Sequence, residues 1–219
     1  MSDFSGVPNP VSLYPPATSR SLESWLGQPS ADAPVEAPSR LREIADNRAV
    51  DISLAAVALA GGIVVVLFGA YWSIMGLVVP PVIIFSIIGA ALILLGRFAL
   101  RLARSRLPKD ERARIVRSSG TARGGITAAA MIWVVTVVMT SPAWPAASAR
   151  DGGWALLMGF YLFLALLLVT CFVVPSIVLG RARESLRRVA EQDGAYRALL
   201  EHDRLTWHPR YGDQMYGPL

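Results

Sequence analysis

Charged residues are absent from three long stretches of this chain. Residues 52–96, 126–144 and 154–179 contain no Asp, Glu, Lys, Arg or His. The hydrocarbon core of a bilayer is about 30 Å thick, and a helix that crosses it needs about 20 predominantly apolar residues. The first stretch is long enough for two crossings, and each of the others for one. The pattern therefore predicts four transmembrane helices.

The first stretch, residues 52–96, is expected to form a hairpin with helices at 52–72 and 77–96. We place the turn at 73–76, because Trp72 favours the headgroup level and Gly76 relaxes the backbone. Pro80 and Pro81 suit the first turn of the second helix, where a missing N–H leaves no bond unmade. One span followed by a re-entrant segment is the alternative, which is disfavoured since irregular backbone cannot face lipid.

A second hairpin is expected over residues 126–179, with helices at 126–144 and 154–179. The helix at 126–144 is the less apolar of the two, because alanines and the polar Thr136 and Thr140 dilute its hydrophobicity. The helix at 154–179 is rich in leucine, and Pro175 is expected to kink it near its end. The predicted fold class is all-α, an integral membrane four-helix bundle built from two transmembrane hairpins.

Basic residues predict the orientation of the four helices. The segment 97–124 holds nine Lys and Arg residues against only Asp110 and Glu111, whereas 73–76 has no charge and 145–153 has only Arg150 and Asp151. Short cytoplasmic loops are enriched in Lys and Arg, so both ends and the 97–124 loop are expected in the cytoplasm. The arginines assigned to topology and lipid headgroups are Arg97, Arg101, Arg104, Arg106, Arg112, Arg114, Arg117, Arg181, Arg183, Arg187 and Arg188. The expected anchors at the outer interface are Trp72, Trp144 and Trp154.

Three segments flank the spans on the cytoplasmic side. Residues 1–39 are rich in Pro and Ser and are expected to be a disordered tail. Residues 40–51 form a juxtamembrane segment, either a short helix or a hinge. In the cytoplasmic segment 180–219, residues 181–206 are expected to continue the last span as one helix, with i, i+4 pairs between Glu184 and Arg188 and between Arg197 and Glu201. Residues 207–219 contain helix breakers and are expected to be irregular, or ordered by a partner.

One patch of the N-terminal tail stands out from its surroundings. Leu22, Trp25 and Leu26 follow the i, i+3, i+4 spacing of an apolar helix face. This spacing indicates a short motif that docks on a partner or on the membrane surface. The alternative is that they are incidental residues of an unstructured tail.

Composition is consistent with the membrane prediction and argues against catalysis. Only 17% of the residues are charged and 53% are hydrophobic. A net charge of +5 would suggest nucleic acid in a soluble protein, but topology and attraction to anionic lipid already account for it, so no nucleic acid is expected. A single cysteine, Cys171, cannot form an internal disulfide. His202 and His208 lie on different helix faces, and no nucleophile set, phosphate loop or metal spacing is present.

These observations favour a protein that is not an enzyme and holds no cofactor or metal. Ionisable residues within spans usually mark transport or catalysis, and here none exist. The leading hypothesis is a non-catalytic accessory, assembly or scaffold subunit in a bacterial cytoplasmic membrane, with anionic lipid and either a protein partner or a second copy as its neighbours. The alternatives are a small oligomeric transporter or permease subunit, and a holin-like pore former.

Overall fold

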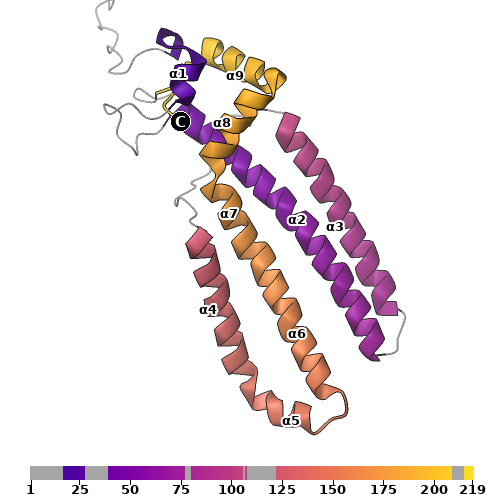
Figure 1. Ribbon diagram of the computed structural model, residues 1–219. Coiled ribbons are helices and arrows are strands. Elements are labelled where there is room, and N and C mark those ends of the chain that lie inside the picture. Colours follow the sequence, from indigo (N-terminus) through magenta and orange to yellow (C-terminus); the bar gives the residue numbers. More distant parts are fainter. Residues whose placement is uncertain (1–16, 28–38, 77–79, 106, 108–121, 209–214) are drawn as a thin grey trace, which may run out of the picture. The chain divides into compact units, whose positions relative to one another are not determined.

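The computed structural model describes residues 17–27, 39–76, 80–105, 107, 122–208 and 215–219 (Figure 1). Every regular element in these ranges is a helix, apart from one isolated parallel bridge between Ser39 and Met215. The all-α prediction is therefore confirmed. Four helical segments are long and apolar enough to cross a membrane, which supports a multi-pass membrane protein. These segments are Arg40–Gly76, Pro80–Ser105, Arg123–Ser148 and Gly153–Gly180.

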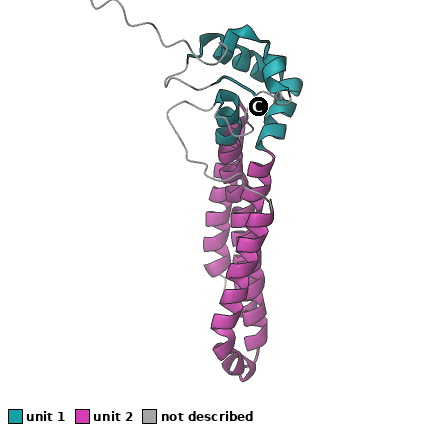
Figure 2. Cartoon of the chain, turned by 90° about the vertical axis from the view of Figure 1, so that its left-hand side faces the viewer, with its two compact units in different colours: residues 1–47, 107–110, 182–219 teal, residues 48–106, 111–181 magenta. Residues whose placement is uncertain are grey.

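The chain divides into two compact units, coloured separately in Figure 2. Unit 1 comprises residues 1–47, 107–110 and 182–219, and unit 2 comprises 48–106 and 111–181. The described helices of unit 1 are η1 (Ala17–Ser19), α1 (Leu22–Leu26), the first turns of α2 (Arg40–Gly76), α8 (Ala182–Gln192) and α9 (Gly194–Thr206). Unit 1 is thus assembled from both ends of the sequence.

In unit 2, α2 packs closely on α3 (Pro80–Ser105) through glycines. A Cβ atom placed on Gly62 would lie 2.7 Å from the carbonyl oxygen of Gly89, and one on Gly96 would lie 2.9 Å from that of Ala55. Contacts this short leave no room for a side chain at these two positions. Glycine therefore allows the backbones of α2 and α3 to approach closely. Because rising numbers in α2 meet falling numbers in α3, the two helices are antiparallel.

The rest of unit 2 consists of α4 (Ala122–Thr140), η2 (Ser141–Ala143), α5 (Trp144–Ser148), α6 (Gly153–Leu168), the π-helical turn η3 (Val169–Val173) and α7 (Val174–Gly180). The α2 helix meets α6 through Phe68 and Phe163, whose ring centroids are 4.0 Å apart. The α4 helix packs on α6, η3 and α7. There, a Cβ on Gly125 would collide with the side chain of Ser176.

The π-helical turn lies directly before Pro175, where the sequence predicted a kink. Proline has no N–H to donate to the carbonyl four residues earlier, and a wider turn is one way in which a helix absorbs that loss. The polar neighbours bond within the helix: Thr170 Oγ1 donates to the Leu166 carbonyl at 2.8 Å, and Ser176 Oγ donates to that of Phe172 at 2.7 Å.

Three expectations about unit 1 are wrong. Residues 17–27 are folded, although residues 1–39 were expected to be a disordered tail in which only the patch of Leu22, Trp25 and Leu26 followed a helical spacing. Residues 1–16 and 28–38 lie outside the described residues. Residues 181–206 do not form one helix, because Asp193 caps a new one by accepting from the N–H groups of Ala195 and Tyr196. Arg197 pairs with Glu23 instead of Glu201. The predicted pair of Glu184 with Arg188 is confirmed at 2.8 Å.

Candidate functional site

The core of unit 1 is centred on Trp25, which is only 1% exposed. Ser21 caps α1 by accepting from the N–H of Ser24, which starts the short helix that carries Trp25. The indole N–H of Trp25 donates to the carbonyl of Ala17 at 3.0 Å, so the polar edge of the ring is satisfied although buried. The other large side chains that are almost completely buried in this unit are Leu41, Ile44, Leu186, Tyr196, Leu200 and Tyr216.

Residues 215–219 lie in this core against α1 and the start of α2. The N–H groups of Arg40 and Leu41 donate to the carbonyls of Met215 and Tyr216, both at 2.9 Å. The hydroxyl of Ser39 donates to the carbonyl of Pro218 at 2.8 Å. The bonds from Arg40 and Leu41 satisfy backbone N–H groups that the first turn of a helix otherwise leaves unpaired.

Gly217 contacts the face of the Trp25 ring. A Cβ at Gly217 would lie 2.6 Å from the indole Cε3 atom, so the backbone approaches the ring more closely than any other residue would allow. The guanidinium of Arg20 lies over the same ring, 5.2 Å from its centroid, a cation–π distance.

Arginine side chains of α8 and α9 fasten the N-terminal segment to unit 1. Arg187 Nε donates to the carbonyl of Leu26 at 2.8 Å, and Arg204 Nη1 donates to that of Arg20 at 2.8 Å. In α2, Arg40 forms an ion pair of 3.2 Å with Asp203. Hydrogen bonds from charged donors are the stronger kind, so this unit is held by long-range polar contacts as well as by its apolar core.

Burial raises the pKa of the Tyr216 phenol well above its ordinary value of 10.0, and the neighbouring carboxylate of Asp203 raises it further. The phenol donates to the carbonyl of Leu200 at 2.9 Å. A neutral donor that is buried and bonded resists ionisation. Tyr216 is therefore a structural hydrogen-bond donor.

The spacing of Leu22, Trp25 and Leu26 predicted a short motif that docks on a partner or on the membrane surface, with incidental residues of the tail as the alternative. The structure finds all three on α1 and buried against the chain's own residues, with α1 in contact with α9. The predicted helical spacing is real. Docking on another protein stays a prediction, and the surface that α1 covers in this structure belongs to the same chain. Periodicity identified the motif, but no local pattern identified α9 and residues 215–219 as what covers it.

The three predicted tryptophan anchors lie at one end of unit 2. Tyr71, next to Trp72, donates its hydroxyl hydrogen to the carbonyl of Ala155, next to Trp154. The rings of Trp154 and Trp144 are 6.4 Å apart. These contacts bring together one end of α2 and the start of α6.

Tyr161, which the sequence did not single out, joins α4, α5 and α6 at the same end. Its hydroxyl is within hydrogen-bonding distance of Thr140 Oγ1 and accepts from the indole N–H of Trp144 at 2.9 Å. Tyr161 is buried in unit 2. The hydroxyls of Thr140 and Tyr161 and the indole N–H of Trp144 would each be costly to leave unpaired in lipid. Here they hydrogen-bond to one another.

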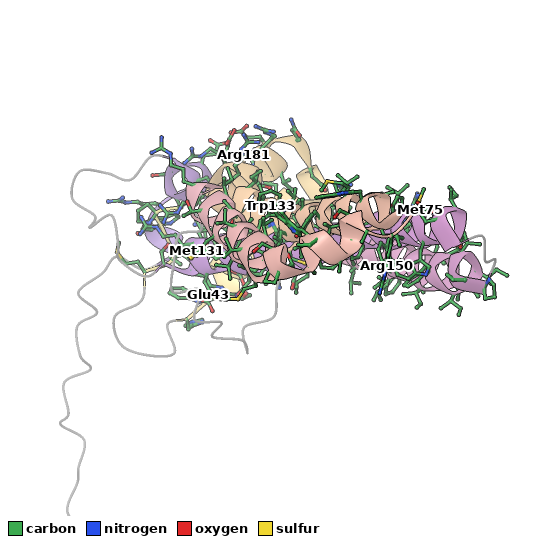
Figure 3. All side chains as sticks on the ribbon, turned by 90° about the horizontal axis from the view of Figure 1, so that it is seen from below. Glu43, Met75, Met131, Trp133, Arg150 and Arg181 are labelled. Carbon is green, nitrogen blue, oxygen red and sulfur yellow. The ribbon has the colours of Figure 1, made fainter. Side chains whose placement is uncertain are left out.

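Contacts between helices place the basic ends together, away from the tryptophans. Gly61 lies close to Thr170 of η3, while Tyr71 meets α6 near its start, so α6 to α7 run antiparallel to α2. Figure 3 draws the side chains, with Arg181 labelled at the end of α7. The described arginines at or beside this end of unit 2 are Arg48, Arg97, Arg101, Arg104, Arg123 and Arg181.

The predicted headgroup arginines fall into three groups. Arg187 and Arg188 are engaged by the protein, with the carbonyl of Leu26 and with Glu184 respectively, and Arg183 interacts electrostatically with Asp46. A second group, Arg97, Arg101, Arg104 and Arg181, makes no ion pair with any carboxylate in the described ranges. Arg106, Arg112, Arg114 and Arg117 lie outside the described residues.

Within the described part of the chain, no three His, Cys, Asp or Glu side chains are grouped as a metal site would require. His208 Nδ1 lies 2.9 Å from the carbonyl of Thr206. Comparison with protein-family models, with curated proteins and with solved structures gave no match. The folded unit and the apolar helices thus define a class, a multi-pass membrane protein with a small helical unit formed by both ends, and no particular family.

Proposed function

We propose that this protein is a non-catalytic accessory, assembly or scaffold subunit of a complex in a bacterial cytoplasmic membrane, with both ends in the cytoplasm. The observation that carries the proposal is the folding of residues from both ends into unit 1. Anchoring in a bilayer requires only the apolar spans and does not require a packed aromatic core outside them. Such a unit offers a rigid surface to another protein.

Insertion into a bilayer is supported by the side chains that unit 2 exposes. Soluble monomers rarely expose apolar patches larger than a few hundred Å², whereas large apolar side chains are exposed along α3 and α4. Those on α3 include Ile83, Ile84, Ile87, Ile88, Leu94 and Leu95, and those on α4 include Met131, Val134, Val135, Val138 and Met139. Hydrocarbon would cover these surfaces.

The charge distribution supports a cytoplasmic location of both ends, and hydrogen bonds support their lying on the same side of the membrane. Arg150 is the single exception among 21 Lys and Arg residues to the rule that they fall on one side of the predicted spans. In addition, the start of α2 and residues 215–216 are joined by backbone hydrogen bonds, so the segments before the first span and after the last lie on the same side of any membrane that the four spans cross.

The scaffold role is tested by affinity purification of the tagged full-length protein from its host in mild detergent, with mass spectrometry of what is retained. The expected result is a partner in fixed stoichiometry. A matched variant, Trp25→Ala, should lose that partner while remaining in the membrane fraction, because it disrupts unit 1 and leaves the spans intact. Arg150→Ala, an exposed residue outside unit 1 in the loop that the proposed topology places on the opposite side of the membrane, is the control.

Two results would contradict the scaffold proposal. One is a homo-oligomer with no other protein attached, combined with solute flux in proteoliposomes, which would favour the transporter alternative. The other is loss of viability on expression with leakage of the membrane, which would favour the holin-like alternative. A partner that is retained equally by Trp25→Ala would show that unit 1 is not its binding surface.

A further inference from the structure

We propose that Arg97, Arg101 and Arg104, at the C-terminal end of α3, bind the phosphate of anionic phospholipid headgroups. We call these three residues the α3 arginine face. This inference rests on the proposed insertion in a membrane and goes beyond the topology signal, because it distinguishes these three arginines from others that the sequence placed in the same group.

The α3 arginine face continues the lipid-facing side of the helix. Its members are spaced i, i+4 and i+7, which places them on one side of an α-helix. Leu94 and Phe98 lie on the same side and are 68% and 66% exposed. Gly96 is buried against α2. On this side of α3, the exposed apolar residues are therefore followed directly by basic residues.

The length of α3 puts this change of character at the level of the headgroups. With Pro80 at one edge of the hydrocarbon and a rise of about 1.5 Å per residue, Arg97 lies about 26 Å along the helix and Arg101 about 32 Å. A hydrocarbon core of about 30 Å therefore ends between them. Arg97 can extend outward along its flexible stem, while Arg101 and Arg104 already lie at the phosphate level.

No carboxylate among the described residues neutralises these side chains. Arg97, Arg101 and Arg104 are exposed, and none of them makes an ion pair or side-chain hydrogen bond with the residues that the structure describes. Arg187 and Arg188 differ, since a carbonyl and a carboxylate of the chain engage them. The guanidinium fork matches the oxygens of a phosphate, so a headgroup is the ligand whose charge, position and geometry fit.

The test compares two triple variants of the full-length protein in nanodiscs of phosphatidylcholine with a minor fraction of phosphatidylglycerol. One variant is Arg97→Gln, Arg101→Gln and Arg104→Gln. The control, Arg150→Gln, Arg188→Gln and Arg197→Gln, removes the same charge elsewhere. After release from the disc, native mass spectrometry counts the phosphatidylglycerol that stays bound. The expected loss is up to about fivefold for each arginine removed from the α3 arginine face, with little loss in the control.

Each other outcome overturns the inference. An equal loss in the two variants would mean that net charge alone attracts the lipid. Displacement of phosphatidylglycerol by inorganic phosphate at the ionic strength of a chloride control would indicate a site for free phosphate. Incorporation into nanodiscs without enrichment of phosphatidylglycerol would contradict the proposed lipid site but not the proposed membrane insertion. Failure of the protein to incorporate at all would contradict both proposals.

Discussion

The backbone N–H of Leu219 donates to the carbonyl oxygen of Trp25 at 3.1 Å. Both residues are buried, at 2% and 1% exposure. The main chain of Trp25 is therefore bonded to the last described segment, while its indole is bonded to Ala17. Trp25 thus joins the described N-terminal segment, residues 17–27, to residues 215–219.

Trp25→Ala should unfold unit 1 or leave it marginally stable. Truncating a fully buried tryptophan costs about 3–5 kcal/mol, which is a large part of the stability of a small unit. Limited proteolysis of the full-length protein in detergent should show faster cleavage within α8 and α9. Leu205→Ala, at an exposed position of the same unit, should be cut at the wild-type rate, and equal rates for the two variants would contradict this role of Trp25.

Tyr216 should make the stability of unit 1 sensitive to alkaline pH. Its pKa in the folded protein is raised above the ordinary 10.0, so its stabilising contribution is complete below about pH 10. Above that pH the unfolded chain ionises first, and the contribution is lost as the pH rises toward the folded-state pKa. Hydrogen exchange of residues 17–27, followed from neutral to alkaline pH, reports the opening of unit 1.

Tyr216→Phe is the matched variant for this prediction. At neutral pH it should be less stable by about 1 kcal/mol, because the hydrogen bond to Leu200 is lost. The difference between the two proteins should then narrow as the pH rises above about 10. A gap in protection that stays constant across this range would show that Tyr216 does not control the alkaline response.

Gly62 and Gly61 should respond in opposite directions to alanine. At Gly61 a new Cβ would meet, among the described residues outside its own helical turns, only a Thr170 methyl group at 3.9 Å. Gly61→Ala should therefore be neutral or stabilise the helix by up to about 1 kcal/mol. Gly62→Ala forces a Cβ against the backbone of Gly89 and should cost about 1–3 kcal/mol. Unfolding midpoints in mixed micelles of increasing sodium dodecyl sulfate distinguish these results, and similar midpoints for both variants would argue against close packing of α2 on α3.

A reporter that is active only in the cytoplasm should be silent when fused after Gly152 and active when fused after Ser105. The expectation follows from the basic residues at one end of the predicted spans and the nearly uncharged loop at the other. Activity of the Gly152 fusion would reverse or abolish the proposed topology. A reporter that folds only outside the cytoplasm, fused at the same two positions, should give the inverse result.

The helices of unit 2 were predictable because their signal is local. An uncharged stretch of bilayer length has few alternatives to a helix in lipid, and the four apolar segments found here contain the predicted spans 52–72, 126–144 and 154–179. For the span at 77–96, α3 begins at Pro80 and residues 77–79 lie outside the described residues. The uneven distribution of arginines between the two sides of the predicted spans is equally visible in the sequence, because it can be found by counting charged residues in each segment.

Unit 1 could not be predicted in the same way. The spacing of Leu22, Trp25 and Leu26 indicated an apolar helix face, but that face would look the same whether it docks on a partner, on lipid or on its own chain. Only long-range contacts select among these, and here they come from α8, α9 and residues 215–219. The pairing of Arg197 with Glu23 has the same origin, because a partner distant in sequence replaced the expected neighbour one turn away.

Composition and charge pattern were therefore sufficient for the number of apolar helices and for the expected orientation, since both depend on what water and lipid tolerate along a local stretch of chain. The folded chain was needed to establish which arginines the protein uses internally and what covers Trp25. Those outcomes depend on close packing and hydrogen bonds between residues that are far apart in sequence. The periodicity of a local segment does not reveal such contacts.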